Sequence, residues 1–264
     1  MLRSLYSGIS GMKNFQTKLD VIGNNIANVN TVGFKKSRVT FKDMISQTVA
    51  GGSAAGGAIG GTNSKQIGLG SSSGTIDTIH STSAPQSTGR TLDLAIDGDG
   101  YFRIDKGDGT VYTRAGNFYL DNTGTLVTGD GYHVLNKDGG TIKIDLDAQS
   151  FSIGSDGNVS IVDAGGQTKD GGQIGIVNFA NSDGLDKIGS NLYRESLNSG
   201  AASEANQPGD GGTGSLKVGF LEMSNVDLTD EFTEMIVAQR GFQSNSKIIT
   251  TSDEILQELV NLKR

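Results

Sequence analysis

The C-terminal stretch, residues 228–264, constrains the fold more than any other part of the chain, because only a long helix can use its apolar repeat. Large apolar side chains recur at steps of four and three, and Gln239, Ser246 and Asp253 occupy the remaining positions. This spacing is typical of a heptad seam. The seam consists of Leu228, Phe232, Met235, Phe242, Ile249, Leu256 and Val260. Asp227 is expected to cap the helix with its carboxylate.

The N-terminal residues offer a partner for that helix. The same spacing is followed by Leu2, Leu5, Ile9, Met12, Leu19 and Ile26, and a second stripe beside it contains Phe15, Ile22 and Val29. An Asn-rich run predicts that this helix ends near Asn28. Residues 1–42 carry seven Lys/Arg and one Asp, whereas residues 224–264 carry four Lys/Arg and seven Asp/Glu. We therefore predict that the two ends pack together and keep surplus apolar surface for neighbouring copies.

The middle of the chain has the pattern of a β domain. Short alternating segments such as Leu92–Ile96 are separated by Asp-Gly pairs such as Asp130-Gly131, which are typical of hairpin turns. The predicted fold class is α+β, with terminal helices that form a coiled-coil-like core domain and a central all-β domain of short antiparallel strands. The predicted divisions are an N-terminal helix and motif (1–42), a Gly/Ser-rich linker (43–90), the β domain (91–220, with a low-complexity loop at 199–214) and a C-terminal helix (221–264).

Composition and isolated motifs argue against several classes of protein. The net charge of -7 is unfavourable for binding nucleic acid, and no apolar run reaches the roughly 20 residues of a membrane span. There is no Cys, and His80 and His133 lack a second ligand at metal spacing. Gly70 to Gly74 matches a nucleophile elbow only by composition, inside a Gly/Ser segment. We therefore predict a protein that is not an enzyme, with no catalytic residue, metal or cofactor.

Two other functional classes remain open from composition alone. A carbohydrate-binding β module would need aromatic platforms, and the chain offers only tyrosines such as Tyr101 and Tyr119, without any Trp. Residues 2–29 are amphipathic enough to lie on a membrane surface, but that hypothesis leaves the C-terminal heptads unexplained.

Three motifs, in order along the chain, resemble those of the bacterial flagellar rod and hook proteins. They are Ala27-Asn28-Val29-Asn30-Thr31-Val32-Gly33-Phe34-Lys35, then Leu92 to Phe102 with Tyr112 to Phe118, and finally Leu221 to Leu228 with Met235 to Arg240. The positions carried over from the family are Asn28, Asn30, Thr31, Gly33, Phe34, Asn225, Gln239 and Arg240. The resemblance covers both ends and the middle of the chain, and only the Gly/Ser segments fall outside it.

The resemblance implies an exported structural subunit, secreted by the flagellar export apparatus, that polymerises with copies of itself into a tube. The implied partners are flagellar rod proteins, hook-filament junction proteins and the hook cap, with neither nucleic acid nor membrane insertion. Details such as Val226-Asp227-Leu228-Thr229 and the ending Leu259 to Arg264 favour the hook protein, a flexible universal joint. The glycine-rich residues 50–74 also suit bendable contacts. The alternative is the distal rod protein, a stiff drive shaft, which the chain matches in length.

Overall fold

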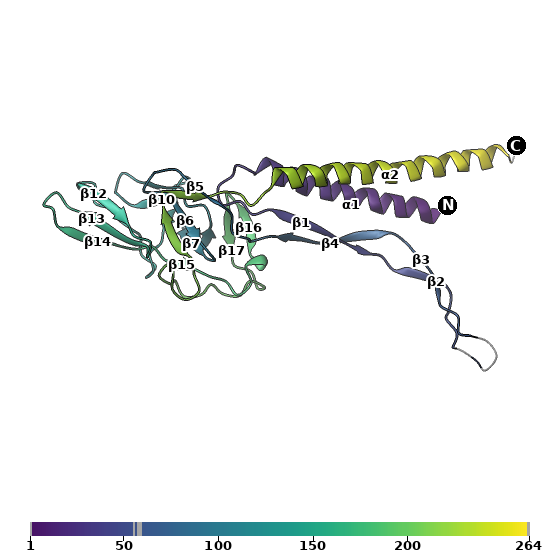
Figure 1. Cartoon of the computed structure of the whole chain (residues 1–264), viewed down its shortest axis with the longest axis horizontal. Coiled ribbons are helices and arrows are strands. Elements are labelled where there is room, and N and C mark those ends of the chain that lie inside the picture. Colours follow the sequence, from purple (N-terminus) through teal and green to yellow (C-terminus); the bar gives the residue numbers. More distant parts are fainter. Residues whose placement is uncertain (1, 55, 57–59, 263–264) are drawn as a thin grey trace. The chain divides into compact units, whose positions relative to one another are not determined.

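The chain forms two compact units, each assembled from segments that are far apart in the sequence. A computed structural model describes residues 2–54, 56 and 60–262. Unit 1 comprises Met1–Ala27, Ser37–Asp77 and Asp227–Arg264. Unit 2 comprises Asn28–Lys36 and Thr78–Val226. The predicted α+β class is confirmed, because the long helices belong to unit 1 and short antiparallel strands build unit 2 (Figure 1).

Unit 1 combines the two terminal helices with two ribbons of strands. Helix α1 (Leu2–Ala27) and helix α2 (Leu228–Asn261) lie side by side (Figure 1). Helix α2 begins at the predicted cap, where the Asp227 carboxylate accepts a hydrogen bond of 2.8 Å from the backbone N–H of Thr229. None of the helices in the described part of the chain has the length and apolar content that a membrane span requires.

Most strands of unit 1 lie in the segment that the sequence predicts as a linker (43–90), while the strand Ser37–Asp43 falls mainly within the predicted N-terminal segment (1–42). Strand β1 (Ser37–Asp43) pairs with β4 (Ser71–Thr78), and β2 (Ser46–Ala50) pairs with β3 (Lys65–Gly68). Every residue of β2 and β3 is exposed. Strand pairing needs only backbone groups, which glycine and serine supply as well as any other residue. The composition therefore indicates the lack of a core here, but the lack of a core does not prevent strand pairing.

Unit 2 is organised around one eight-stranded sheet, in the order β16-β17-β8-β7-β11-β10-β9, with β15 paired to β7 outside this path. Its strands are β7 (Tyr101–Asp105), β8 (Thr110–Thr113), β9 (Phe118–Leu120), β10 (Leu126–Thr128), β11 (His133–Val134), β15 (Ile176–Val177), β16 (Asp186–Gly189) and β17 (Leu192–Arg194). Asp-Gly turns join many of them, as the sequence predicts: Gly109 and Gly131 adopt positive φ angles of 134° and 85°. Such angles suit glycine because it has no Cβ.

Smaller sheets complete unit 2. A three-stranded sheet contains β12 (Ser150–Ile153), β13 (Asn158–Val162) and β14 (Thr168–Gln173). The C-terminal segment enters through β18 (Ser215–Val218), which pairs with β6 (Leu94–Asp97), and β19 (Phe220–Glu222), which pairs with β5 (Pro85–Ser87). A short 3-10 helix spans Ser182–Gly184. The main core includes Phe102, Phe118, Val134, Ile142 and Ile174, all without exposed surface. Leu216 of β18 also belongs to this core, so unit 2 is completed by residues near the C-terminus.

Candidate functional site

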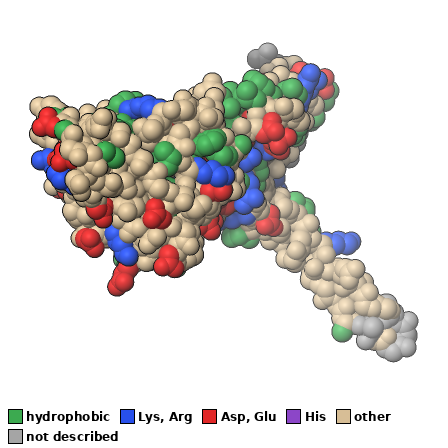
Figure 2. Space-filling model, turned by 60° about the vertical axis from the view of Figure 1, so that its left-hand side comes forward, with side chains coloured by type: hydrophobic (Ala, Val, Ile, Leu, Met, Phe, Trp, Pro, Cys, Tyr) green, Lys and Arg blue, Asp and Glu red, His purple; other side chains and the backbone are tan. Residues whose placement is uncertain are grey.

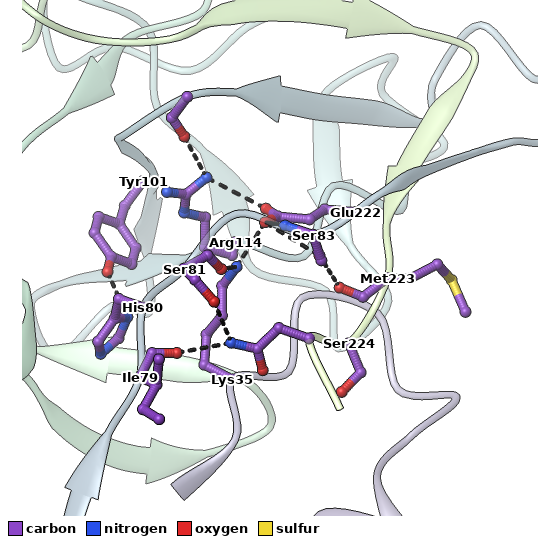
Figure 3. Close-up of polar contacts among 12 residues, drawn as sticks. Lys35, Ile79, His80, Ser81, Ser83, Tyr101, Arg114, Glu222, Met223 and Ser224 are labelled. Carbon is purple, nitrogen blue, oxygen red and sulfur yellow. Dashed lines mark hydrogen bonds and ion pairs between the residues drawn. The ribbon is translucent and has the colours of Figure 1, made fainter. Parts of the chain in front are cut away.

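A buried carboxylate, Glu222 at the end of β19, is the centre of a polar cluster in unit 2 (Figure 3). Its side chain is 2% exposed and receives two cations. Lys35 Nζ lies 2.6 Å from Oε1, and Arg114 Nη1 lies 3.3 Å from Oε2; these cations are 0% and 2% exposed. Burial lowers the pKa of Lys35, and the ion pair with Glu222 opposes this effect. The carboxylate therefore offsets much of the cost of burying both cations.

The three charged residues come from the three sequence motifs. Lys35 follows the N-terminal Asn-rich run, Arg114 follows β8, and Glu222 belongs to the C-terminal motif. The N-terminal motif is also held by its backbone, because the Gly33 N–H donates to the carbonyl of Glu222 at 2.8 Å. Gly33 has a φ of +69°, and a Cβ there would lie 2.7 Å from the Ala115 nitrogen. The motifs are thus distant in sequence but form one cluster.

Asn225 stabilises the same cluster through hydrogen bonds of its side-chain amide. Its Oδ1 accepts a hydrogen bond from the Lys36 N–H at 2.7 Å. Its Nδ2 donates to the Ile79 carbonyl at 2.9 Å and to Ser81 Oγ at 3.0 Å. Ser81 also offers its carbonyl to Lys35 Nζ at 2.7 Å (Figure 3). One amide therefore joins the N-terminal motif to the segment that follows β4.

His80 lies beside these cations in an aromatic setting. Its Nδ1 is 2.7 Å from the Tyr101 hydroxyl, and its Nε2 is buried without a hydrogen-bond partner (Figure 3). Burial, together with the charges of Lys35, Lys187 and Arg114, lowers the pKa of His80 to about 4. Burial also raises the pKa of Tyr101. The imidazole is therefore neutral near pH 7. Within the described residues, no three His, Asp or Glu side chains are grouped so that they could hold a metal ion.

In unit 1, the contact between α1 and α2 is made by small and polar residues of α2. Its buried residues are Glu231, Ala238 and Ser252, which are spaced seven or fourteen residues apart. Gly241 allows close approach, because a Cβ at that position would lie 2.5 Å from the ring of Phe15. A narrow seam of this kind lets the two helices pack tightly while most of the large apolar residues of α2 stay exposed.

Most large apolar residues of α2 remain exposed. They are Leu228, Phe232, Ile236, Val237, Phe242, Ile248, Ile255, Leu259 and Val260, and Leu262 at the C-cap is exposed as well. Of the seven residues in the predicted seam, only Met235, Ile249 and Leu256 are half-buried. The buried face thus differs from the predicted seam. The physical reason is that close packing of α1 on α2 needs small side chains, which an apolar repeat does not reveal.

The other predicted assembly residues lie on α1. Ile22 is buried; Leu5, Met12, Phe15, Leu19 and Ile26 are half-buried, and Ile9 is exposed. The side chain of Leu2 lies outside the described residues. Of the family positions, Phe34 is buried, Gln239 and Arg240 are exposed on α2, and Asn28, Asn30 and Thr31 form the turn that leads to Gly33. Their role in assembly stays a prediction.

Asn25 connects three elements of unit 1. Its amide donates to the Ser37 carbonyl at 2.9 Å and accepts from the Ser37 N–H at 3.0 Å. It also donates to Glu231 Oε2 at 3.2 Å, so α1, β1 and α2 meet at one buried side chain. Sequence reasoning did not single out Asn25 or the cluster of Glu222. The available signal was that the motifs carry charges of opposite sign, Lys35 and Arg114 against Glu222.

In comparisons with known protein families, three descriptions match different parts of the chain. Residues 5–35 match "Flagella basal body rod protein", residues 95–161 match "Flagellar hook protein FlgE/F/G D1 domain" and residues 217–262 match "Flagellar basal body rod FlgEFG protein C-terminal". The chain is 92% identical over all 264 residues to the flagellar basal-body rod protein FlgG of Bacillus subtilis (strain 168), with both chains fully covered.

The chain belongs to the flagellar rod and hook protein family. The resemblance read from the sequence is confirmed. As a member of this family, the chain is a structural protein of the bacterial flagellum and not an enzyme, as predicted.

The sequence-based prediction that the chain is a hook protein rather than a rod protein is wrong. FlgG of Borreliella burgdorferi is 42% identical over 268 residues, with both chains fully covered. The hook protein FlgE of the same organism is only 30% identical, over 442 residues. The rod protein FlgG therefore matches the chain in length and is more similar to it in sequence than the hook protein FlgE is. The short motif details that favoured the hook therefore pointed to the wrong member of the family.

We predict that Glu222→Gln destabilises unit 2 strongly. The substitution leaves Lys35 and Arg114 buried without an anion, which costs about 3–5 kcal/mol of unfolding free energy. Urea unfolding followed by the near-ultraviolet circular dichroism of the tyrosines measures this cost. The matched control is Asp97→Asn, which breaks the more exposed ion pair with Lys217 and should cost less than about 1 kcal/mol. Equal effects of the two variants would contradict the prediction.

We predict that His80 makes unit 2 less stable as the pH falls. The folded state holds the pKa of His80 at about 4, below the unfolded value of 6.5. The stabilisation from the neutral ring is therefore complete above pH 6.5 and is lost as the pH falls toward 4, by up to about 3 kcal/mol. Urea unfolding of the wild type and of His80→Gln across this range measures the difference. An unchanged pH dependence in the variant would disprove it.

We predict that Asn25→Ala loosens unit 1. The variant leaves the Ser37 backbone and Glu231 without their buried partner, which should cost at least about 2 kcal/mol. Thermal unfolding followed by far-ultraviolet circular dichroism measures the loss of helix. Gln16→Ala, on an exposed position of α1, is the control and should have little effect.

Proposed function

We propose that the chain is a structural subunit of the rod of the flagellar basal body, where copies polymerise into a stiff tube that acts as a drive shaft. The observation that carries the proposal is the row of exposed large apolar residues along α2. It is supported by the name shared by full-length relatives, flagellar basal-body rod protein.

The exposed row on α2 is too large for an isolated soluble subunit. Monomeric proteins rarely leave a long contiguous apolar surface uncovered. Burying each of these side chains contributes about 1.5–3 kcal/mol, so neighbouring copies gain much by covering them. Head-to-tail contacts that do not close into a ring generate a helical tube. The helices of unit 1 are thus the proposed assembly surface.

The distribution of charge supports different positions for the two units in the proposed polymer. Unit 1 has ten Lys/Arg and ten Asp/Glu, whereas unit 2 has twelve Lys/Arg and nineteen Asp/Glu. Figure 2 shows acidic side chains scattered over the β domain and hydrophobic ones gathered on the helical part. Repulsion between acidic surfaces disfavours close packing of unit 2. We therefore propose unit 1 as the shared stem and unit 2 as the outer, solvent-facing part.

The paired strands of unit 1 favour a stiff subunit. The sequence-based argument for the hook relied on a loose glycine-rich linker at residues 50–74. The structure has paired strands within this range, including β3 and β4, and the Met44 N–H donates to the Gly70 carbonyl at 2.9 Å. Paired strands resist sliding better than a flexible chain does, which suits a drive shaft. The proposed partners are copies of the chain, other rod and hook subunits, and the flagellar export apparatus.

We predict that Phe242→Ser prevents rod assembly. A strain that lacks the chain should have basal bodies without the distal part of the rod, and the wild-type chain should restore it. The variant should fail to do so, because it removes apolar contact between copies from the middle of α2. Electron microscopy of isolated basal bodies gives the readout.

The control is Leu146→Ser, the same type of change at an exposed apolar residue of unit 2. This variant should restore the rod. Basal bodies that keep a full rod without the chain, and lack only the hook, would overturn the proposed function.

A further inference from the structure

One of the nine Asp-Gly pairs in unit 2 has a hydrogen bond of an unusual kind. In this pair the Gly211 N–H donates to Oδ1 of Asp210, the residue directly before it, at 2.8 Å. At four other pairs the glycine N–H donates instead to the carbonyl three residues earlier, and these glycines are Gly131, Gly139, Gly157 and Gly184. Within the described residues, no other Asp-Gly pair makes the contact of Gly211.

The contact holds the nitrogen of Gly211 against the carboxyl group of Asp210. Because Oδ1 is bonded to Cγ, the nitrogen lies next to the carbon with which it can close a ring. Atoms held in this way react faster than the same atoms in a mobile chain. Gly211 has no side chain to hinder the approach, and Gly209 and Gly212 on either side of the pair have none either. The pair is exposed, so water reaches it.

Two other aspartates make the same contact without a glycine after them. Asp121 Oδ1 accepts from the Asn122 N–H at 2.7 Å. Asp163 Oδ1 accepts from the Ala164 N–H at 2.9 Å. In both, the residue that supplies the nitrogen carries a Cβ, which crowds the approach to the carboxyl group. Asp210 therefore combines the contact with an unhindered nitrogen.

Thr213 acts on the main-chain carbonyl of Asp210. This carbonyl accepts from the Thr213 N–H at 3.1 Å and from Thr213 Oγ1 at 2.7 Å, and Thr213 is buried. Two donors draw electron density from the peptide group, so the Gly211 N–H gives up its proton more readily. They also stabilise the negative charge that forms on this oxygen when water attacks its carbon. The turn therefore assists ring closure and directs water to this carbon.

We propose that Asp210 is a modification site, at which the chain converts this aspartate into isoaspartate without an enzyme. The Gly211 nitrogen bonds to Cγ of the neutral carboxyl group, its proton joins the departing hydroxyl, and one water is released as a succinimide ring forms. A second water then adds to the main-chain carbonyl carbon of Asp210, whose bond to the nitrogen breaks, and the nitrogen recovers a proton. The main chain now runs through Cβ and Cγ, and the former main-chain carbonyl is a free carboxylate.

The modification adds one backbone carbon just before β18. Leu216 of β18 belongs to the main core, and β19 with Glu222 follows it. The hydrogen bonds of Thr213 fix the length of the unmodified turn, so an added carbon strains them. Molecules with isoaspartate should therefore unfold at a lower urea concentration than unmodified ones. This inference does not depend on assembly and goes beyond the proposed function.

The test uses the full-length wild-type chain, incubated in water labelled with heavy oxygen. Peptide mapping with electron-transfer fragmentation then measures isoaspartate at each position. We expect at least about tenfold more isoaspartate at Asp210 than at Asp130 or Asp121. Asp130 is followed by glycine but lacks the contact, whereas Asp121 has the contact but no glycine. Each isoaspartate should carry at least one labelled oxygen, because it forms by addition of water.

Unfolding separates the effect of the fold from that of the sequence. In guanidinium chloride, Asp210 should lose its excess over Asp130, because Gly211 no longer meets the carboxyl group. Thr213→Val, which removes the hydroxyl donor, should slow the conversion in the folded chain, and Asp210→Glu should abolish it. Equal amounts of isoaspartate at Asp210 and Asp130 in the folded chain, or an excess that persists after unfolding, would overturn the proposal.

Discussion

The structure of unit 2 depends on the pairing of one buried carboxylate with two buried cations. An ion taken out of water is costly unless its partner is close and its remaining hydrogen bonds are satisfied. Glu222 meets Lys35 and Arg114, and these cations also donate to the carbonyls of Ser81 and Gly98. The three distant segments that carry these residues must therefore all be in place for the charges to be paired. The apolar core stabilises the sheet, and this triad joins segments that follow β8, precede β1 and form β19.

In unit 1 a buried polar side chain also joins distant segments, but it is a neutral amide rather than a charged group. Asn25 binds the Ser37 backbone and Glu231, so helix α1, strand β1 and helix α2 share one buried amide. The seam between the helices uses Ala238, Ser252 and glycine, and most of the large apolar side chains of α2 stay exposed. A helix that packed its largest residues inward would have a better isolated fold and a poorer surface for neighbours. The arrangement stabilises the subunit and leaves large apolar side chains of α2 available for the proposed assembly.

Much of the fold could be predicted from the sequence because local rules govern it. Heptad spacing predicted both helices, Asp227 predicted the start of α2, and Asp-Gly pairs predicted the hairpins. The face of α2 that is buried could not be predicted, because it depends on close approach at Gly241 rather than on apolarity. The triad of Glu222 was missed because its members are separated by up to 187 residues. Nor could glycine content distinguish a loose linker from paired strands.

Both units contain residues from the two ends of the chain. A chain that stops before Glu222 has no anion for Lys35 and Arg114, and α1 then has no helix to pack against. A product that ends before Glu222 therefore lacks a finished version of either unit. The fold itself distinguishes whole subunits from such fragments, because only a whole subunit contains both units in complete form.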